Sequence, residues 1–219
     1  MDGTSVDDFE PQLSVRVART LEDLQKVMVV RALVYMNEQD CPYEEEYDGN
    51  DFAGATHFLC EFDGEPVGSL RLRFFNGFAK IERVALRPHA RKGGGAHLLM
   101  GAAIETMRRK GYTKFLGQVQ YGLLEYWQKK HGLIHREHRG VFTFSDRAYV
   151  EIEGRYDPHP DALTMESDPL VLDRPEGDWD RPGPLDKTAR RGASPVQPGR
   201  DTPMPAGAGA AKNPVMETE

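Results

Sequence analysis

Apolar and polar residues alternate over residues 14–18, which predicts a short first strand. Apolar residues such as Leu24 and Val27 then recur at helical spacing until about Met36, and Thr20 precedes them with a side chain suited to an N-cap. The chain is therefore expected to begin with a strand that is followed by a helix.

A polar, acidic connector over residues 37–55 separates this helix from three strand-like segments. These segments span residues 57–61, 66–74 and 78–86. Asp-Gly at 63–64 and Asn-Gly at 76–77 lie between them, and both pairs are strong signals for tight hairpins. The middle third of the domain is thus predicted to be an antiparallel meander.

Beyond the meander, the pattern alternates between helix and strand. It predicts a helix over 96–110, a strand over 114–120, a short helix over 123–131, and strands over 133–144 and 147–155. A helix between two neighbouring strands forms a βαβ unit, whose strands run parallel. The expected fold class is therefore α/β (α+β): a mixed central sheet with an antiparallel meander, a βαβ unit and helices on both faces.

The chain has 219 residues, enough for one domain and a tail. Eight of its 15 prolines lie in residues 174–219, where large aliphatic residues are scarce. The predicted organisation is a flexible N-terminus (1–12), a single folded domain (13–157), an extended C-terminal extension (158–173) and a disordered tail (174–219).

The charge balance is 28 basic against 35 acidic residues, a net charge of −7. It gives no general attraction for nucleic acid or anionic membranes, so neither is expected as a partner. Two cysteines provide no disulfide framework and suit a reducing compartment. The acidic N-terminus does not resemble a signal peptide, and no apolar run approaches a membrane span. A soluble, cytoplasmic protein is expected.

A run of three glycines, Gly93-Gly94-Gly95, directly follows a predicted strand and opens a helix at Ala96. Without Cβ atoms, an incoming group can approach the backbone N–H donors, and the helix dipole favours an anion such as a pyrophosphate. Arg91 and Lys92 add positive charge. The alternative is a glycine-rich turn before an ordinary helix.

This loop is similar to the Arg-x-x-Gly-x-Gly/Ala motif of the GCN5-related N-acetyltransferases (GNAT), through Arg91, Gly94 and Ala96. The Val84-x-Leu86-x-Pro88 context and the element order extend the resemblance over about residues 14–155. Residues 31–43 and an acidic pair after them resemble the ElaA-like branch of this family, with a looser likeness to autoinducer synthases.

The resemblance implies a GNAT fold and acetyl-CoA as co-substrate. The pyrophosphate would bind to Arg91, Lys92, Gly93, Gly94, Gly95 and Ala96. The pantetheine arm would lie along Val84, Ala85 and Leu86, where a backbone N–H would polarise the thioester carbonyl. The implied reaction is direct attack by a primary amine on acetyl-CoA in a ternary complex.

An alkylammonium group must lose a proton before it attacks, so a base or a water relay is needed. Glu82 is the candidate base, and a cross-strand ion pair is its alternative role. Gln128 occupies the place where many family members carry a Tyr as general acid. Tyr126, or Tyr121, would substitute for it; otherwise the thiolate leaves toward water.

The acidic run over residues 44–51 suggests that the acceptor is a cationic amine, either a small molecule or a lysine side chain; a solvated loop is the alternative. His131, His135 and His138 have suggestive spacing, but Gly132 separates them, and no metal is expected. Two rival functions remain: an acyltransferase with a carrier-protein donor, and a non-catalytic acyl-CoA sensor. A monomer and a homodimer are both compatible with the sequence.

Overall fold

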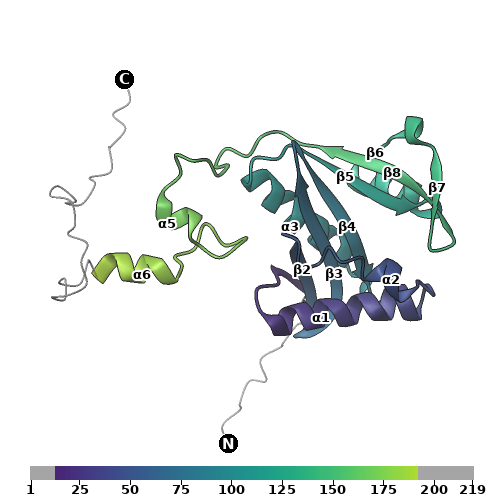
Figure 1. The fold of residues 1–219 in the computed structure, drawn as a ribbon, viewed down its shortest axis with the longest axis horizontal. Helices are drawn as coiled ribbons and strands as arrows, with labels where there is room; N and C mark the ends of the chain where they lie inside the picture. Colours follow the sequence, from purple (N-terminus) through teal and green to yellow (C-terminus); the bar gives the residue numbers. More distant parts are fainter. Residues whose placement is uncertain (1–12, 192–219) are drawn as a thin grey trace, which may run out of the picture.

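The computed structural model describes residues 13–191, and their central element is an eight-stranded mixed sheet (Figure 1). The strand order is β1-β2-β3-β4-β5-β8-β6, and β7 pairs with β8. The strands are β1 (Leu13–Val17), β2 (Thr56–Phe62), β3 (Glu65–Phe75), β4 (Phe78–Leu86), β5 (Lys114–Gln120), β6 (Ile134–His135), β7 (Val141–Phe144) and β8 (Arg147–Arg155). The predicted fold class is confirmed.

The antiparallel meander of β2, β3 and β4 forms as the hairpin signals predict. Asp63 and Gly64 have φ values of 50° and 81°, so both central residues of the first turn are left-handed, as in a type I′ hairpin. β1 adds to the outer edge by antiparallel pairing with β2. Local turn chemistry therefore accounts for this half of the sheet.

Two long helices pack on opposite faces of the meander. α1 (Leu21–Arg31) begins with a capping box between Thr20 and Asp23 and continues into a π-helical segment, η1 (Ala32–Asn37). Together, α1 and η1 form a small buried hydrophobic cluster with β4. α3 (Gly95–Arg109) buries Leu99 and Met107 in the main core on the other face. The short α2 (Tyr43–Glu46) lies in the connector between α1 and β2.

The βαβ unit forms as predicted, but its two strands stay together only briefly. β4 pairs in parallel with β5 from Ala79 to Ile81, opposite Phe115 to Gly117. Beyond this point the two strands part, and the 3₁₀ turn η2 (Pro88–Ala90) leads from β4 toward α3. The sheet therefore opens between β4 and β5 on the side where the glycine loop lies.

The second half of the sheet consists of β5, β8 and their short neighbours. The predicted strand over 133–144 is interrupted, because a 3₁₀ turn, η4 (Glu137–Arg139), separates β6 from β7. The predicted helix over 123–131 is present as η3 (Tyr121–Leu123) followed by α4 (Leu124–His131), which ends at Gly132 with a left-handed C-cap.

The C-terminal extension continues past the position at which the sequence predicts a disordered tail. Helices α5 (Pro169–Leu172) and α6 (Pro184–Arg191) lie in it, and Trp179 is only 6% exposed. Lys110 and Arg19 bind Glu176, and Arg109 binds Asp180. These contacts hold Glu176 and Asp180 against the domain. Residues 1–12 and 192–219, for which the sequence predicts flexible termini, lie outside the described residues.

Candidate active site

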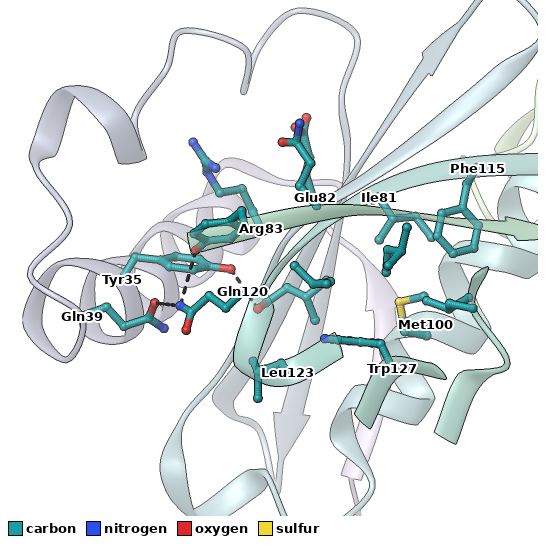
Figure 2. A pocket seen from close by; sticks show the side chains of 17 residues that line it. Tyr35, Gln39, Ile81, Glu82, Arg83, Met100, Phe115, Gln120, Leu123 and Trp127 are labelled. Atoms are coloured by element: carbon teal, nitrogen blue, oxygen red, sulfur yellow. Dashed lines mark hydrogen bonds between the residues drawn. The ribbon is translucent and has the colours of Figure 1, made fainter. Parts of the chain in front are cut away.

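A cavity of about 110 Å³ lies where β4 and β5 part (Figure 2). One side of its wall is apolar and comes from α3, β5, β8 and the segment from the end of η3 to just beyond α4; it includes Met100, Phe115, Val119, Leu123, Trp127, Leu133 and Ile152. The other side carries hydroxyl, amide and charged groups, from Tyr35, Gln39, Glu82, Arg83, Gln118, Gln120 and Tyr149. The cavity thus offers an apolar surface and a polar surface to one occupant.

A bulge in β4 forms part of the cavity wall. Glu82 pairs with Arg71 and Ala85 with Ser69, so two residues of β4, Arg83 and Val84, oppose one residue of β3. Arg83 has a φ of 55°, which is unusual for a residue with a side chain. A bulge re-aims the backbone groups of a strand, here toward the cavity that Val84 lines.

Tyr35 of η1 holds this bulge in place through a hydrogen bond. Its hydroxyl donates a hydrogen bond of 2.8 Å to the carbonyl oxygen of Val84. Burial raises the pKa of Tyr35 well above its usual value, so the phenol keeps its proton. Because this proton is donated to the carbonyl oxygen of Val84, the role of Tyr35 is to stabilise the bulged conformation of β4.

The glycine loop opens α3 immediately beyond β4. Gly94 is the N-cap residue, with a φ of 84°, and a Cβ placed there would meet open space. A Cβ on Gly95 would lie 2.7 Å from Cδ2 of Leu86, so the loop approaches the end of β4 closely. The start of α3, with its N–H groups and positive dipole end, therefore lies beside the strand that lines the cavity.

Arg91 is fixed at the same loop. Its Nε donates to the carbonyl oxygen of Leu86 at 3.0 Å, and its guanidinium lies 2.5 Å from the carboxylate of Glu38. Lys92 is exposed beside it. The loop thus presents two cations, one of them already paired with a carboxylate that an incoming anion would have to displace.

Glu82 lies on the polar side of the cavity but is surrounded by cations. Its carboxylate binds Arg71 at 3.1 Å, Lys80 at 3.0 Å and Arg73 at 3.4 Å. Burial alone would raise the pKa of Glu82, but the positive charges of Arg71 and Lys80 outweigh burial and hold the pKa below its usual range. Glu82 is therefore an ionised and weakly basic carboxylate.

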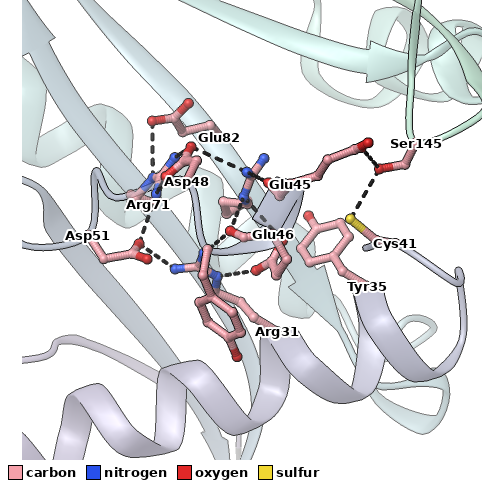
Figure 3. A network of polar contacts seen from close by, with 12 residues as sticks. Arg31, Tyr35, Cys41, Glu45, Glu46, Asp48, Asp51, Arg71, Glu82 and Ser145 are labelled. Atoms are coloured by element: carbon pink, nitrogen blue, oxygen red, sulfur yellow. Dashed lines mark hydrogen bonds and ion pairs between the residues drawn. The ribbon is translucent and has the colours of Figure 1, made fainter. Parts of the chain in front are cut away.

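Part of the acidic connector joins an ion network around two buried arginines, while Glu44 and Asp48 of the same run are exposed (Figure 3). Arg31 is fully buried and binds Glu46 and Asp51, each at 2.5 Å. Arg71, also fully buried, binds Asp48 at 2.7 Å and Asp51 at 2.8 Å. Arg83 also binds Glu46 and Asp48, so these arginines together pair with three of the acidic side chains from which the sequence suggests a cationic acceptor.

The hairpin between β7 and β8 closes the connector end of the site. Ser145, in a two-residue turn with Asp146, donates a hydrogen bond of 2.5 Å to Glu45 and lies 3.1 Å from the thiol of Cys41. Arg147 donates to the backbone carbonyl of Gln39 at 3.2 Å. The polar wall of the cavity is thus built from the connector, β5 and β8 together.

The two tyrosines named from the sequence as candidate acids, and Gln128 at the usual Tyr place, lie outside the cavity lining. Tyr126 is 41% exposed and its ring contacts Trp127 and His131. Tyr121 and Gln128 are exposed as well. Trp127, the neighbour of both Tyr126 and Gln128, faces the cavity instead. Sequence reasoning missed Tyr149 as a cavity residue, and it included Tyr35 only within the 31–43 resemblance, because no local motif connects η1 or β8 with β4.

Two structural features bear on the partners expected from the sequence. Within residues 13–191, no three histidine, cysteine or carboxylate side chains gather in an arrangement that could hold a metal ion. Within the same residues, no helix combines the length and apolar character that a membrane crossing requires. Cys41 and Cys60 are both free and buried.

Comparisons with known proteins agree with this architecture. A sequence profile of the acetyltransferase (GNAT) family matches residues 21–133. The uncharacterized N-acetyltransferase YjcF of Bacillus subtilis is 31% identical over 117 residues, which cover 53% of this chain and 81% of the relative. The structure of an acyl-CoA N-acyltransferase from Pseudomonas aeruginosa is 26% identical and superposes with a TM-score of 0.57, over 66% of this chain and 99% of that chain.

The structure of Escherichia coli ElaA superposes equally well, with a TM-score of 0.57 over 66% of this chain and 99% of that chain. At 20% identity this likeness is one of fold. The chain belongs to the GNAT family of acetyltransferases, and it is an N-acetyltransferase of this type.

Proposed function

We propose that the protein transfers an acetyl group from acetyl-CoA to a primary amine, by direct attack within a ternary complex. The observation that carries this proposal is the continuity of the site. The glycine loop at the start of α3 touches the end of β4, and the bulge of β4 lines the cavity at which β4 and β5 part. One extended donor molecule could reach from loop to cavity.

The donor would bind in two parts. The N–H groups of Gly93 to Ala96, together with Arg91 and Lys92, suit the pyrophosphate, because the start of α3 combines free backbone donors with positive charge. Val84, Ala85 and Leu86 would hold the pantetheine arm through their backbone, on the stretch of β4 that β5 no longer pairs. A redirected N–H at the bulge would polarise the thioester carbonyl.

The charges around Glu82 argue for a supporting role rather than for direct deprotonation of the acceptor. An alkylammonium has a pKa of about 10.4 and a free Glu one of about 4.3, so transfer of the proton to Glu82 is uphill by at least about 8 kcal/mol. The lowered pKa of Glu82 increases this cost. We therefore propose that the amine reaches the thioester in its neutral form, and that its ammonium proton leaves to water.

The polar side of the cavity indicates the chemistry of the acceptor. Its side chains include three amides, on Gln39, Gln118 and Gln120, and the carboxylate of Glu82 is already matched by cations. Such a wall offers hydrogen bonds without excess negative charge. We propose that amines with polar neutral substituents are better acceptors than polycationic amines.

The glycine loop can be tested by calorimetric titration with acetyl-CoA. Gly94→Glu places a carboxylate where the pyrophosphate would lie, and we expect acetyl-CoA affinity to fall at least about 100-fold with the fold retained. Gly77→Glu is the matched control: Gly77 also has a left-handed φ, of 77°, and open space around its Cβ, but it lies in the β3–β4 turn. Equal affinity of the two variants would refute the assigned loop.

Turnover is tested on the same samples by thiol release with a panel of amines. Faster release of CoA with an amine that carries polar neutral substituents than with spermidine supports the proposed acceptor class. Binding of acetyl-CoA without thiol release from any amine would instead identify a non-catalytic acyl-CoA-binding module.

A further inference from the structure

Three polar side chains of the cavity lining form a cluster around one nitrogen atom. The amide nitrogen of Gln120 donates to the amide oxygen of Gln39 at 2.8 Å and to the hydroxyl oxygen of Tyr149 at 3.4 Å (Figure 2). These residues come from the connector, β5 and β8, and all three line the cavity. The fold thus brings together polar groups that lie far apart in the chain.

The cluster keeps hydrogen-bonding capacity that the protein itself does not use. An amide side chain has two N–H donors and a carbonyl acceptor, and a tyrosine hydroxyl has one donor. Within residues 13–191, no protein group bonds to the N–H groups of Gln39, the hydroxyl proton of Tyr149 or the amide carbonyl of Gln120. Donors and an acceptor in one cluster complement an amide group, whose carbonyl accepts and whose N–H donates.

The cluster lies on the acceptor side of the sheet. Val119 packs with α3 in the main core, and side chains alternate along a strand, so Gln120 lies on the face opposite to α3. Gln39 follows η1, whose Tyr35 bonds to Val84 of the bulge at 2.8 Å. The donor of the proposed function comes from the start of α3, which leaves this cluster for the acceptor.

The charges in the lining restrict the acceptor independently. Glu82 is bound by three cations, so it is a poor base, and an acceptor must reach the thioester already neutral. At pH 7 about a tenth of an α-amino group is neutral, against about one molecule in 2,500 of an alkylamine such as a lysine side chain. The site therefore favours a weakly basic amine, which is what an amine beside an amide group is.

Resting on the proposed function, we propose that the acceptor is an α-amino amide, the arrangement found at the N-terminus of a peptide, and that Gln39, Gln120 and Tyr149 determine this specificity. The amide carbonyl of the acceptor accepts from Gln39 and Tyr149, and its N–H donates to Gln120. The α-nitrogen bonds to the acetyl carbon, and the C–S electron pair leaves with sulfur. The proton that the nitrogen loses passes through water to the thiolate, so that protons and charge balance.

Thiol release by the wild type tests the acceptor class without any substitution. Glycinamide is compared with propargylamine, an amine of similar basicity that has no amide group. The kcat/KM for glycinamide should be at least about tenfold higher, as expected for two or more added hydrogen bonds. Nα-acetyl-lysine amide, which offers a lysine side chain, should be a poorer acceptor than glycinamide at pH 7. A higher kcat/KM for glycylglycinamide than for glycinamide would identify a peptide N-terminus, and the reverse order a small amino amide.

Two substitutions test the residues that make the contact. Gln39→Met removes amide donors and Tyr149→Phe removes one hydroxyl donor, so the preference for glycinamide over propargylamine should fall about tenfold and about three- to tenfold, respectively. Calorimetry with acetyl-CoA shows that each variant is folded. Gln128→Met, at an exposed position of α4 outside the cavity lining, is the matched control and should keep the wild-type preference.

The possible failures are distinguishable. If the wild type uses propargylamine or the lysine derivative as well as glycinamide, the acceptor class is wrong and the proposed function stands. If the preference for glycinamide survives in both Gln39→Met and Tyr149→Phe, the cluster does not recognise the amide. If acetyl-CoA binds but no amine releases CoA, the proposed function and this inference both fall.

Discussion

The half of the sheet formed by β1 to β4 and the half formed by β5 to β8 are stabilised by different contacts. In the first half, fully buried arginines on α1 and β3 bind carboxylates from the connector. In the second half, ion pairs such as Arg139–Glu151 lie near the surface, and the strands are held by backbone pairing and apolar packing. Three parallel residue pairs join the halves.

This difference explains where the cavity lies and why its walls differ. The ion network fixes the connector and the bulged strand β4 as one unit, while β8 approaches them from the other side through the hairpin tip at Ser145. The site forms at the seam, and residues of both halves line its polar wall. The following changes weaken one half at a time, from the largest expected effect to the smallest.

Arg71→Met should be the most damaging change. It leaves Asp48, Asp51 and Glu82 without their shared cation, and removal of one partner from a buried ion network costs about 3–5 kcal/mol. Denaturant unfolding measures the loss. Arg139→Met is the matched change in the other half: the Arg139 side chain is 57% exposed, and the expected loss is below about 0.5 kcal/mol. Equal losses of unfolding free energy in the two variants would show that the ion pairs of the two halves do not differ in their contribution to stability.

Acid should destabilise the first half selectively. Burial raises the pKa values of Asp48, Asp51 and Glu82, but the guanidinium of Arg71, joined at Asp51 by that of Arg31, outweighs burial and holds these pKa values below their usual range. Their stabilising effect is present above the unfolded pKa values of about 4, and it is lost as pH falls through the lower folded values.

Unfolding free energies measured from pH 7 down to pH 3 check this expectation. The wild type should lose stability below about pH 4, and Arg71→Met should show a shallower acid dependence because its carboxylates lack the cation that lowers their pKa values. Parallel curves for the two proteins would contradict the role given to Arg71.

Gly154→Ala tests the packing of the second half. A Cβ on Gly154 would lie 2.3 Å from the ring of Phe115, so the ring or β8 must move. Overpacking of this kind costs about 1–3 kcal/mol. The variant should also weaken acetyl-CoA binding, since Phe115 lines the cavity, whereas an unchanged unfolding midpoint would show that the ring shifts without cost.

Ser145→Ala should lower stability by only about 1 kcal/mol, because it removes one hydrogen bond between the hairpin tip and the connector. Its expected signature is kinetic: a higher KM for the amine with unchanged affinity for acetyl-CoA. A change in acetyl-CoA affinity alone would place the hairpin tip at the donor side of the site.

The features predictable from the sequence are those that depend on residues close together in the chain. Asp63-Gly64 specifies a hairpin, and Gly93 to Gly95 before Ala96 specifies a loop that opens a helix. Such signals were enough for the element order and the fold class. The motif of the glycine loop carried the family resemblance for the same reason.

The polar wall could not be predicted, because its members meet only through the folded sheet. Tyr149 reaches the cavity through its register with Gln120, which is 29 residues earlier in the chain. Likewise, Arg31 and Arg71 look like ordinary helix and strand residues, and nothing local shows that they neutralise the acidic connector. The acidic run predicts a cationic acceptor, and nothing in the run itself shows that Glu46, Asp48 and Asp51 bind arginines of the fold.

We propose that an acyl-CoA donor lies along the glycine loop and the bulge of β4. Titration of the ¹⁵N-labelled protein with acetyl-CoA, followed by NMR, tests this placement residue by residue. We expect the largest shifts at the amides of Gly94 to Ala96 and of Val84 and Ala85, with little change at the Asp63-Gly64 hairpin. Saturable shifts that leave both the loop and the bulge unaffected would contradict it.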